Sequence, residues 1–319
     1  MKRKYFIKLI VALAIFMNLF FVRFANGQQF NKNATSGFQF LQIPVSSKYA
    51  GMAEAAIAIK ELKSDAIFHN PGILGFIEDN HLLSFSYAPY FADIKSYSAS
   101  YLLRSDFGVF AIGSSVFDYG QFDKTLPGVY QSVGKFSAAS YQMSSAYSKR
   151  LTDKFAFGIA LKYVEEKIDN YKASNILFDG GVLYYTGFNS LRIAAAIQHF
   201  GVDAKFINDP FKMPSVLKIG FAYELFGNYE SDFRVTVMSE ALHPNDADEK
   251  VNAALEIGLL KTISLRGGYK FFYDEETFSL GIGFCYMTGD FPIDIDYSYS
   301  DYGRLGGISR LSVSIGLKR

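Results

Sequence analysis

Large apolar residues alternate with small or polar residues along most of the chain after about residue 80. In residues 154–164, one set of alternate positions is large and apolar: Phe155, Phe157, Ile159, Leu161 and Tyr163. The other set is small or charged: Ala156, Gly158, Ala160 and Lys162. The same alternation recurs in residues 191–197, 217–223, 263–269, 278–284, 293–299 and 311–317. A period of two residues indicates β-strands rather than helices.

The length of these segments distinguishes a membrane barrel from a water-soluble sandwich, which also alternates. Strands of globular proteins have about 5–6 residues, whereas those that cross an outer membrane need about 9–11. Here the segments have about ten. The predicted strands are 80–89, 93–103, 107–119, 135–149, 154–166, 173–186, 190–200, 215–224, 231–240, 251–259, 262–272, 275–287, 291–300 and 309–318. We therefore predict an all-β protein whose residues 80–319 form a transmembrane antiparallel β-barrel of about fourteen strands.

The connections between the predicted strands are short and long in alternation. Bacterial barrels have short periplasmic turns and longer extracellular loops. This rule predicts that both ends of the mature chain lie on the periplasmic side. The longest connections, all on the other side, are the candidate partner-contact surfaces: residues 120–134, 201–214, 241–250 and 301–308.

The first 27 residues have the pattern of a secretory signal peptide. A basic start at residues 1–4 is followed by an apolar run from Leu9 to Val22 and by small residues at Ala25 and Gly27. The apolar run is shorter than the roughly 20 residues of a spanning helix. Removal of residues 1–27 leaves 27 Lys+Arg against 31 Asp+Glu, which argues against nucleic-acid binding. We therefore expect export to the outer membrane of a Gram-negative cell, in contact with its lipid.

Residues 28–79 follow the strand pattern less well. Residues 51–58 are rich in alanine, and residues 64–71 end in an Asn-Pro turn signal. We interpret this part as a plug-like N-terminal segment that lies in or below the barrel lumen. The alternative is an additional periplasmic pair of strands.

Charged residues occupy the small-residue face of several predicted strands, which in a barrel faces the lumen. The lumen-facing charges are Lys162, Arg192, Arg234, Glu256, Arg266, Asp294 and Asp296. Charges of both signs favour a filled lumen over a wide pore. Asp294 and Asp296 share one face and could alternatively bind Ca²⁺, but no third acid stands near them. The chain has no metal, phosphate-binding or catalytic motif, so we expect neither an enzyme nor a cofactor.

The N-terminal segment resembles that of FadL-like outer-membrane proteins. The shared features are a Gly-x-x-Glu-Ala stretch at residues 51–55 and the motif residues Asp65, Asn70, Pro71 and Leu74. Met52 and Ala53 replace a second glycine of the family pattern, and Gly72 replaces an alanine. The resemblance implies a FadL-like barrel.

Within that group the chain is most similar to the PorV/PorQ family. The motifs that carry this resemblance, in order, lie at residues 41–50, 87–94, 119–122, 134–140 and 151–162. The resemblance covers residues 38–205 and implies a non-enzymatic component of a type IX-like protein secretion system. Its partners would be secretion-system proteins and exported cargo. The alternative function is a FadL-like channel for hydrophobic small molecules, gated by the N-terminal segment, with a kinked strand that opens a lateral exit.

Overall fold

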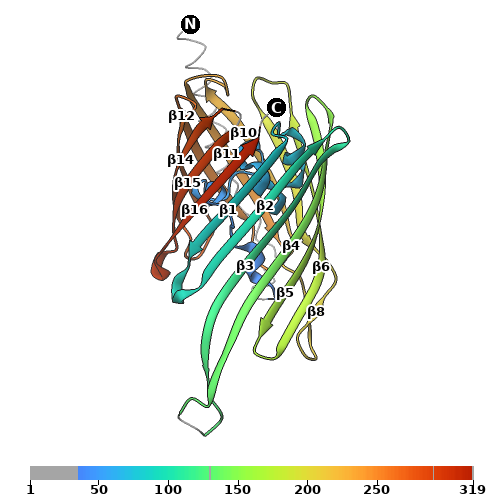
Figure 1. Cartoon of the computed structure of the whole chain (residues 1–319), viewed down its shortest axis with the longest axis vertical. Coiled ribbons are helices and arrows are strands. Elements are labelled where there is room, and N and C mark those ends of the chain that lie inside the picture. Colours follow the sequence, from blue (N-terminus) through green and yellow to red (C-terminus); the bar gives the residue numbers. More distant parts are fainter. Residues whose placement is uncertain (1–34, 129–130, 290, 318–319) are drawn as a thin grey trace, which may run out of the picture. The chain divides into compact units, whose positions relative to one another are not determined.

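The computed structural model describes residues 35–128, 131–289 and 291–317, and the barrel belongs to one compact unit, residues 32–319. In this part of the chain fourteen antiparallel strands close into a barrel, which confirms the predicted fold class (Figure 1). The wall strands are β1(His81–Pro89), β2(Lys95–Ser105), β3(Gly108–Lys124), β4(Gly134–Thr152), β5(Phe155–Ile168), β6(Tyr171–Tyr185), β7(Arg192–Phe200), β10(Val216–Phe226), β11(Phe233–Pro244), β12(Lys250–Leu259), β13(Ile263–Phe271), β14(Phe278–Thr288), β15(Phe291–Asp301) and β16(Gly307–Leu317). Every consecutive pair of wall strands is joined, and β16 pairs with β1 from Leu311↔Tyr87 to Leu317↔His81.

The connections between the wall strands contain a few short elements. The loop between β7 and β10 contains a two-stranded ladder of β8(Ala204–Lys205) and β9(Pro210–Phe211), which the alternation of residues did not predict. Short helical turns occur at η4(Phe91–Asp93) and η5(Gly303–Leu305). No helix among the described residues is long and apolar enough to cross a membrane. The predicted signal peptide, residues 1–27, lies outside the described residues.

The two faces of the wall have the inverted polarity of a membrane barrel. On β5, Ile159, Leu161 and Tyr163 point outward and are 44%, 55% and 44% exposed. The alternate residues Ala160, Lys162 and Val164 point inward and are buried. A large apolar exterior is stable only against lipid, and a polar interior needs partners inside the lumen.

The N-terminal segment, residues 35–80, supplies those partners. Its helical turns are η1(Gln39–Gln42), α2(Ser47–Gly51), η2(Lys60–Phe68) and η3(Pro71–Phe76). These turns lie within the ring of strands (Figure 1). α2 packs against β13 to β16, and η3 packs against β3 to β6 on another part of the wall. Most of the segment's residues are buried, including Met52, Ile57, Ile67 and Leu74.

The segment crosses the lumen from one end of the barrel to the other. Ser36 forms a β-bridge with Lys212, which lies in the long connection between β7 and β10. At the other end of the segment, the Asn80 N–H donates to the Leu317 carbonyl, where β16 ends. The first residues of the predicted mature chain, which we expect on the periplasmic, short-turn side, lie outside the described residues. The described part of the segment begins at the long-loop end, where Ser36 bonds to Asp246 and Phe38 packs on Phe211.

A slot of glycines holds the Asn70-Pro71-Gly72 turn against the wall. Gly158 on β5 and Gly181 on β6 are direct cross-strand partners. A Cβ atom on Gly158 would lie 2.3 Å from the Pro71 backbone, and one on Gly181 would lie 2.0 Å from Asn70 Oδ1. Only residues without a Cβ atom allow the turn to approach this closely.

We predict that Gly158→Ala destabilises the barrel by about 1–3 kcal/mol, because the added methyl group overpacks the slot. Gly180→Ala is the matched control, since a Cβ on Gly180 would meet nothing nearer than 3.6 Å. The measurement is urea unfolding of the folded protein in detergent, followed by tyrosine fluorescence. Equal unfolding free energies for the two variants would contradict the close packing.

Candidate functional site

The lumen is the candidate functional site, and the predicted lumen-facing charges all lie in it. Lys162, Arg192, Arg234, Glu256, Arg266, Asp294 and Asp296 are each at most 9% exposed. Each occupies an inward position of its strand because the backbone places alternate side chains on opposite faces of the wall. An isolated buried charge is strongly unfavourable, so their partners decide whether the arrangement is stable.

Eight residues form a chain of alternating charge, which we call the charge ladder. In order it runs Glu61, Arg234, Glu256, Arg266, Asp296, Lys48, Asp294 and Lys63. Five members come from β11 to β15, and three come from the N-terminal segment. The formal charges of the eight side chains sum to zero, so the ladder neutralises itself within the lumen.

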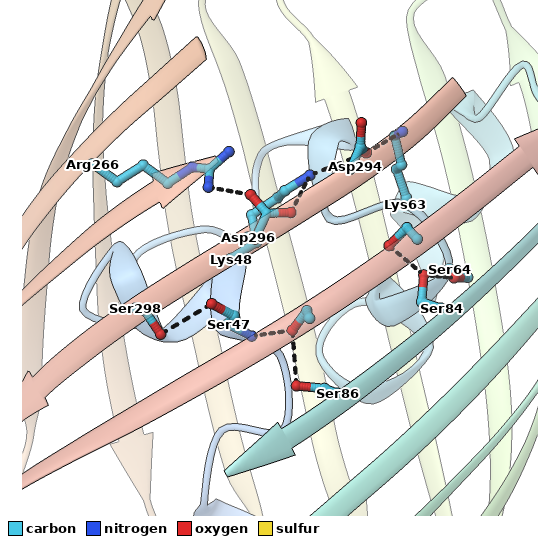
Figure 2. A network of polar contacts seen from close by, with 12 residues as sticks. Ser47, Lys48, Lys63, Ser64, Ser84, Ser86, Arg266, Asp294, Asp296 and Ser298 are labelled. Carbon is cyan, nitrogen blue, oxygen red and sulfur yellow. Dashed lines mark hydrogen bonds and ion pairs between the residues drawn. The ribbon is translucent and has the colours of Figure 1, made fainter. Parts of the chain in front are cut away.

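The centre of the ladder lies on β15 (Figure 2). Asp294 and Asp296 are two residues apart and therefore point to the same side of the strand. Lys48 reaches both carboxylates, with Nζ–O distances of 3.7 Å and 3.5 Å, while Lys63 pairs with Asp294. Arg266 donates from Nε to Glu256 at 2.7 Å and from Nη1 to Asp296. The two aspartates are thus occupied by lysine and arginine groups, and no metal-binding cluster occurs among the described residues.

Other inward charges form separate pairs. Lys162 contacts Asp179 at 2.5 Å, Arg192 contacts Glu224 at 2.7 Å, and Lys218 contacts Glu240 at 3.6 Å. Lys270 pairs with Glu54 of the N-terminal segment at 2.5 Å. Sequence reasoning missed Asp179, although its inward position on β6 follows from the alternation. It could not find Glu54, Lys48 and Lys63, because no periodicity shows which wall strand the N-terminal segment faces.

The family-motif residues Asp65 and Asn70 connect the segment to the wall. The Ser100 hydroxyl on β2 donates to Asp65 Oδ1 at 2.7 Å. Asn70 Nδ2 donates to the Ile57 carbonyl at 2.9 Å and to the Val182 carbonyl on β6 at 3.1 Å. Asn70 Oδ1 accepts the Gly72 N–H at 2.9 Å, which caps η3, and Pro71 begins that turn. These residues therefore hold the N-terminal segment in position against the barrel wall.

Serine side chains tie the segment to the seam at which β1 and β16 close the barrel (Figure 2). The Ser47 N–H donates to Ser312 Oγ at 2.9 Å, and the Ser312 hydroxyl donates to Ser86 Oγ on β1 at 2.8 Å. Ser64 and Ser84 share a hydrogen bond of 2.7 Å. The N-terminal segment thus contacts both strands of the seam.

The two halves of the lumen differ in chemistry. At the loop end, Phe38 packs on Phe211 with ring centroids 5.7 Å apart, and Phe40 packs on Phe117 at 5.9 Å. At the turn end, a cavity of about 300 Å³ lies between the N-terminal segment and β11 to β15. We call this cavity the turn-end chamber. Its lining includes every member of the charge ladder.

Comparisons with known proteins bear on the fold. No protein-family model matches the sequence, and no curated protein matches it. The structure is similar to the Ralstonia pickettii toluene transporter TbuX, with a TM-score of 0.55, 16% identity, and coverage of 89% of this chain and 98% of that one. It is also similar to the Pseudomonas putida toluene transporter TodX, with a TM-score of 0.54, 14% identity, and coverage of 80% and 93%. The chain therefore has the same FadL-like barrel fold as these two proteins.

Proposed function

We propose that this chain is a gated outer-membrane channel for hydrophobic small molecules, with the N-terminal segment as its gate. The observation that carries the proposal is a likeness of fold along nearly the whole of two toluene transporters. The channel, which was the alternative from the sequence, is therefore preferred to the secretion role, because the secretion role rests on sequence motifs alone.

The chemistry of the lumen fits a channel that is closed at rest. The aromatic side chains of Phe38, Phe40, Phe117 and Phe211 give the loop end an apolar surface on which a hydrophobic molecule can be desolvated. The charge ladder at the turn end is unfavourable for such a molecule. Transport through the lumen therefore requires the N-terminal segment to move.

The contacts of the N-terminal segment indicate on which side it can separate from the barrel wall. On the β4 to β6 side it is held by the close backbone approach in the glycine slot. On the β11 to β15 side it is held by ion pairs beside the turn-end chamber, where water can replace each partner. The β2–β3 ladder is unbroken from Gly108 to Asp118 and offers no lateral exit, whereas the β6–β7 ladder changes register between Phe178 and Gly180. The irregularity of β3 lies at Asp118–Gln121, at the loop end.

We predict that cells lacking this chain take up a radiolabelled hydrophobic molecule such as toluene several-fold more slowly, and that the wild-type gene restores the rate. Phe38→Ser with Phe40→Ser should restore it only in part, because the apolar loop end is lost. Phe122→Ser with Phe136→Ser is the matched control, since these two rings stack on each other in the extended β3–β4 hairpin and are not part of the Phe38 and Phe40 contacts. Equal uptake with and without the chain would contradict the channel.

A second candidate is a docking platform of a type IX-like secretion system, in which the barrel binds cargo or translocon partners. The ordered PorV/PorQ-like motifs favour it, as does the β3–β4 hairpin, which extends well beyond its neighbours on the loop side (Figure 1). The predicted contact surface 120–134 lies at the end of this hairpin, where β3 continues to Lys124 and β4 begins at Gly134.

We predict that, if the platform is correct, shortening the hairpin by removal of residues 121–137 lowers the amount of exported protein in the culture medium. This change leaves the membrane-level pairing of β3 and β4 in place, so hydrophobic uptake should not change. Mass spectrometry of the medium, compared with the wild type, provides the measurement. An unchanged set of exported proteins together with intact uptake would leave only the channel.

A further inference from the structure

Two lysines stand directly opposite each other on the outer face of the barrel. Lys167 on β5 and Lys172 on β6 are cross-strand partners near the loop end of these strands. Their alternate neighbours Glu166 and Ala173 are less exposed, and Ala173 is buried on the lumen side. Like charges directly opposite each other destabilise a strand pair. Negative charge beside the two lysines would relieve this repulsion. The described residues supply only part of that charge.

One carboxylate approaches this pair. Glu165 Oε2 lies 3.7 Å from Lys172 Nζ and also accepts a hydrogen bond from the Tyr163 hydroxyl at 2.8 Å. Lys167 has no acidic partner among the described residues. The other outward lysines of this region differ, since Lys95 stands opposite Asp118 and Lys135 stands opposite Asp123.

An apolar groove lies beside the lysine pair, toward the middle of the membrane. It has a volume of about 710 Å³ and runs across the outer face of β1 to β6. Small outward residues, among them Ala99, Ser114 and Ser145, line the groove where most outward positions of the barrel are large. Larger side chains, including Met143 and Leu161, line it further. A groove of this kind in the lipid-facing wall accommodates a hydrocarbon chain.

The spacing of groove and lysines matches an amphiphilic lipid. Tyr163 and Ile176 line the groove and are direct partners across β5 and β6. Each lies four residues from one lysine of the pair on the same face, which is about 13 Å along the strand. Aromatic residues of a barrel form girdles at the membrane interfaces, so Tyr163 places the loop-side edge of the groove near the interface and the rest of the groove at acyl-chain level. The lysines lie about 13 Å farther toward the loop end, at the level of the headgroup phosphates.

We propose that Lys167 and Lys172 bind a phosphate group of a lipid A-type glycolipid, with one of its acyl chains in the groove. The long-loop side of the barrel is the outer side, and phosphorylated glycolipid forms the outer leaflet of Gram-negative outer membranes. A phosphate between the two ammonium groups removes their repulsion and forms charge-assisted hydrogen bonds. This site is on the lipid face and is independent of the lumen and of either function above.

Native mass spectrometry of the purified full chain in detergent, titrated with lipid A, tests the headgroup contact. The wild type should retain lipid A in preference to phosphatidylethanolamine, which has no net charge. Lys167→Gln with Lys172→Gln should bind lipid A about 30-fold more weakly, the loss expected for two lysines at an anionic lipid surface. Lys95→Gln with Lys135→Gln, which removes the same charge opposite aspartates, should bind as the wild type does.

A second variant tests the groove without touching the lysines. Ser145→Phe fills the groove and should weaken lipid A binding, whereas Ala253→Phe, an outward position on β12, should not. Both substitutions place an apolar side chain against lipid, so neither should prevent folding. Equal lipid A binding by the wild type and the double lysine variant would overturn the proposal. Preferential retention of phosphatidylglycerol over lipid A would overturn the choice of glycolipid.

Discussion

Charge pairing across the lumen is the interaction on which the filled interior of this barrel depends. The strands β11 to β15 place buried acids and bases in the lumen, and removal of one partner of a buried pair costs about 3–5 kcal/mol. Lys48 and Lys63 compensate Asp294 and Asp296, and within the described part of the barrel wall Arg266 is the one cation that pairs with them. The wall and the N-terminal segment are therefore stable only together.

The remaining contacts of the segment follow from this constraint. The glycine slot at Gly158 and Gly181 fixes the segment on one side of the lumen, and the charge ladder holds it on the other. The serine hydrogen bonds at Ser47 and Ser64 join the segment to the two strands that close the barrel. Filling of the lumen and closure of the wall are thus connected, while the lipid-facing surface is free to serve other contacts.

The barrel was predictable from the sequence because its strands obey a strict period of two. All fourteen wall strands of the described chain match the predicted segments, with ends that differ by a few residues. The longest difference lies at β3, which continues past Gly120 through an irregular position to Lys124. The inward direction of Arg266 and Asp296 follows from the same alternation. The partners Lys48 and Lys63 were not predictable in this way, because the position of the N-terminal segment depends on contacts between residues far apart in the sequence.

We propose that the N-terminal segment closes the lumen and that the charge ladder holds it there. Ionic conductance of the full chain in planar lipid bilayers tests this most directly. We predict almost no steady conductance for the wild type, and frequent open events for Lys48→Met with Lys63→Met, which leaves Asp294 without its lysine partners. A large steady conductance of the wild type, equal to that of the double variant, would contradict it.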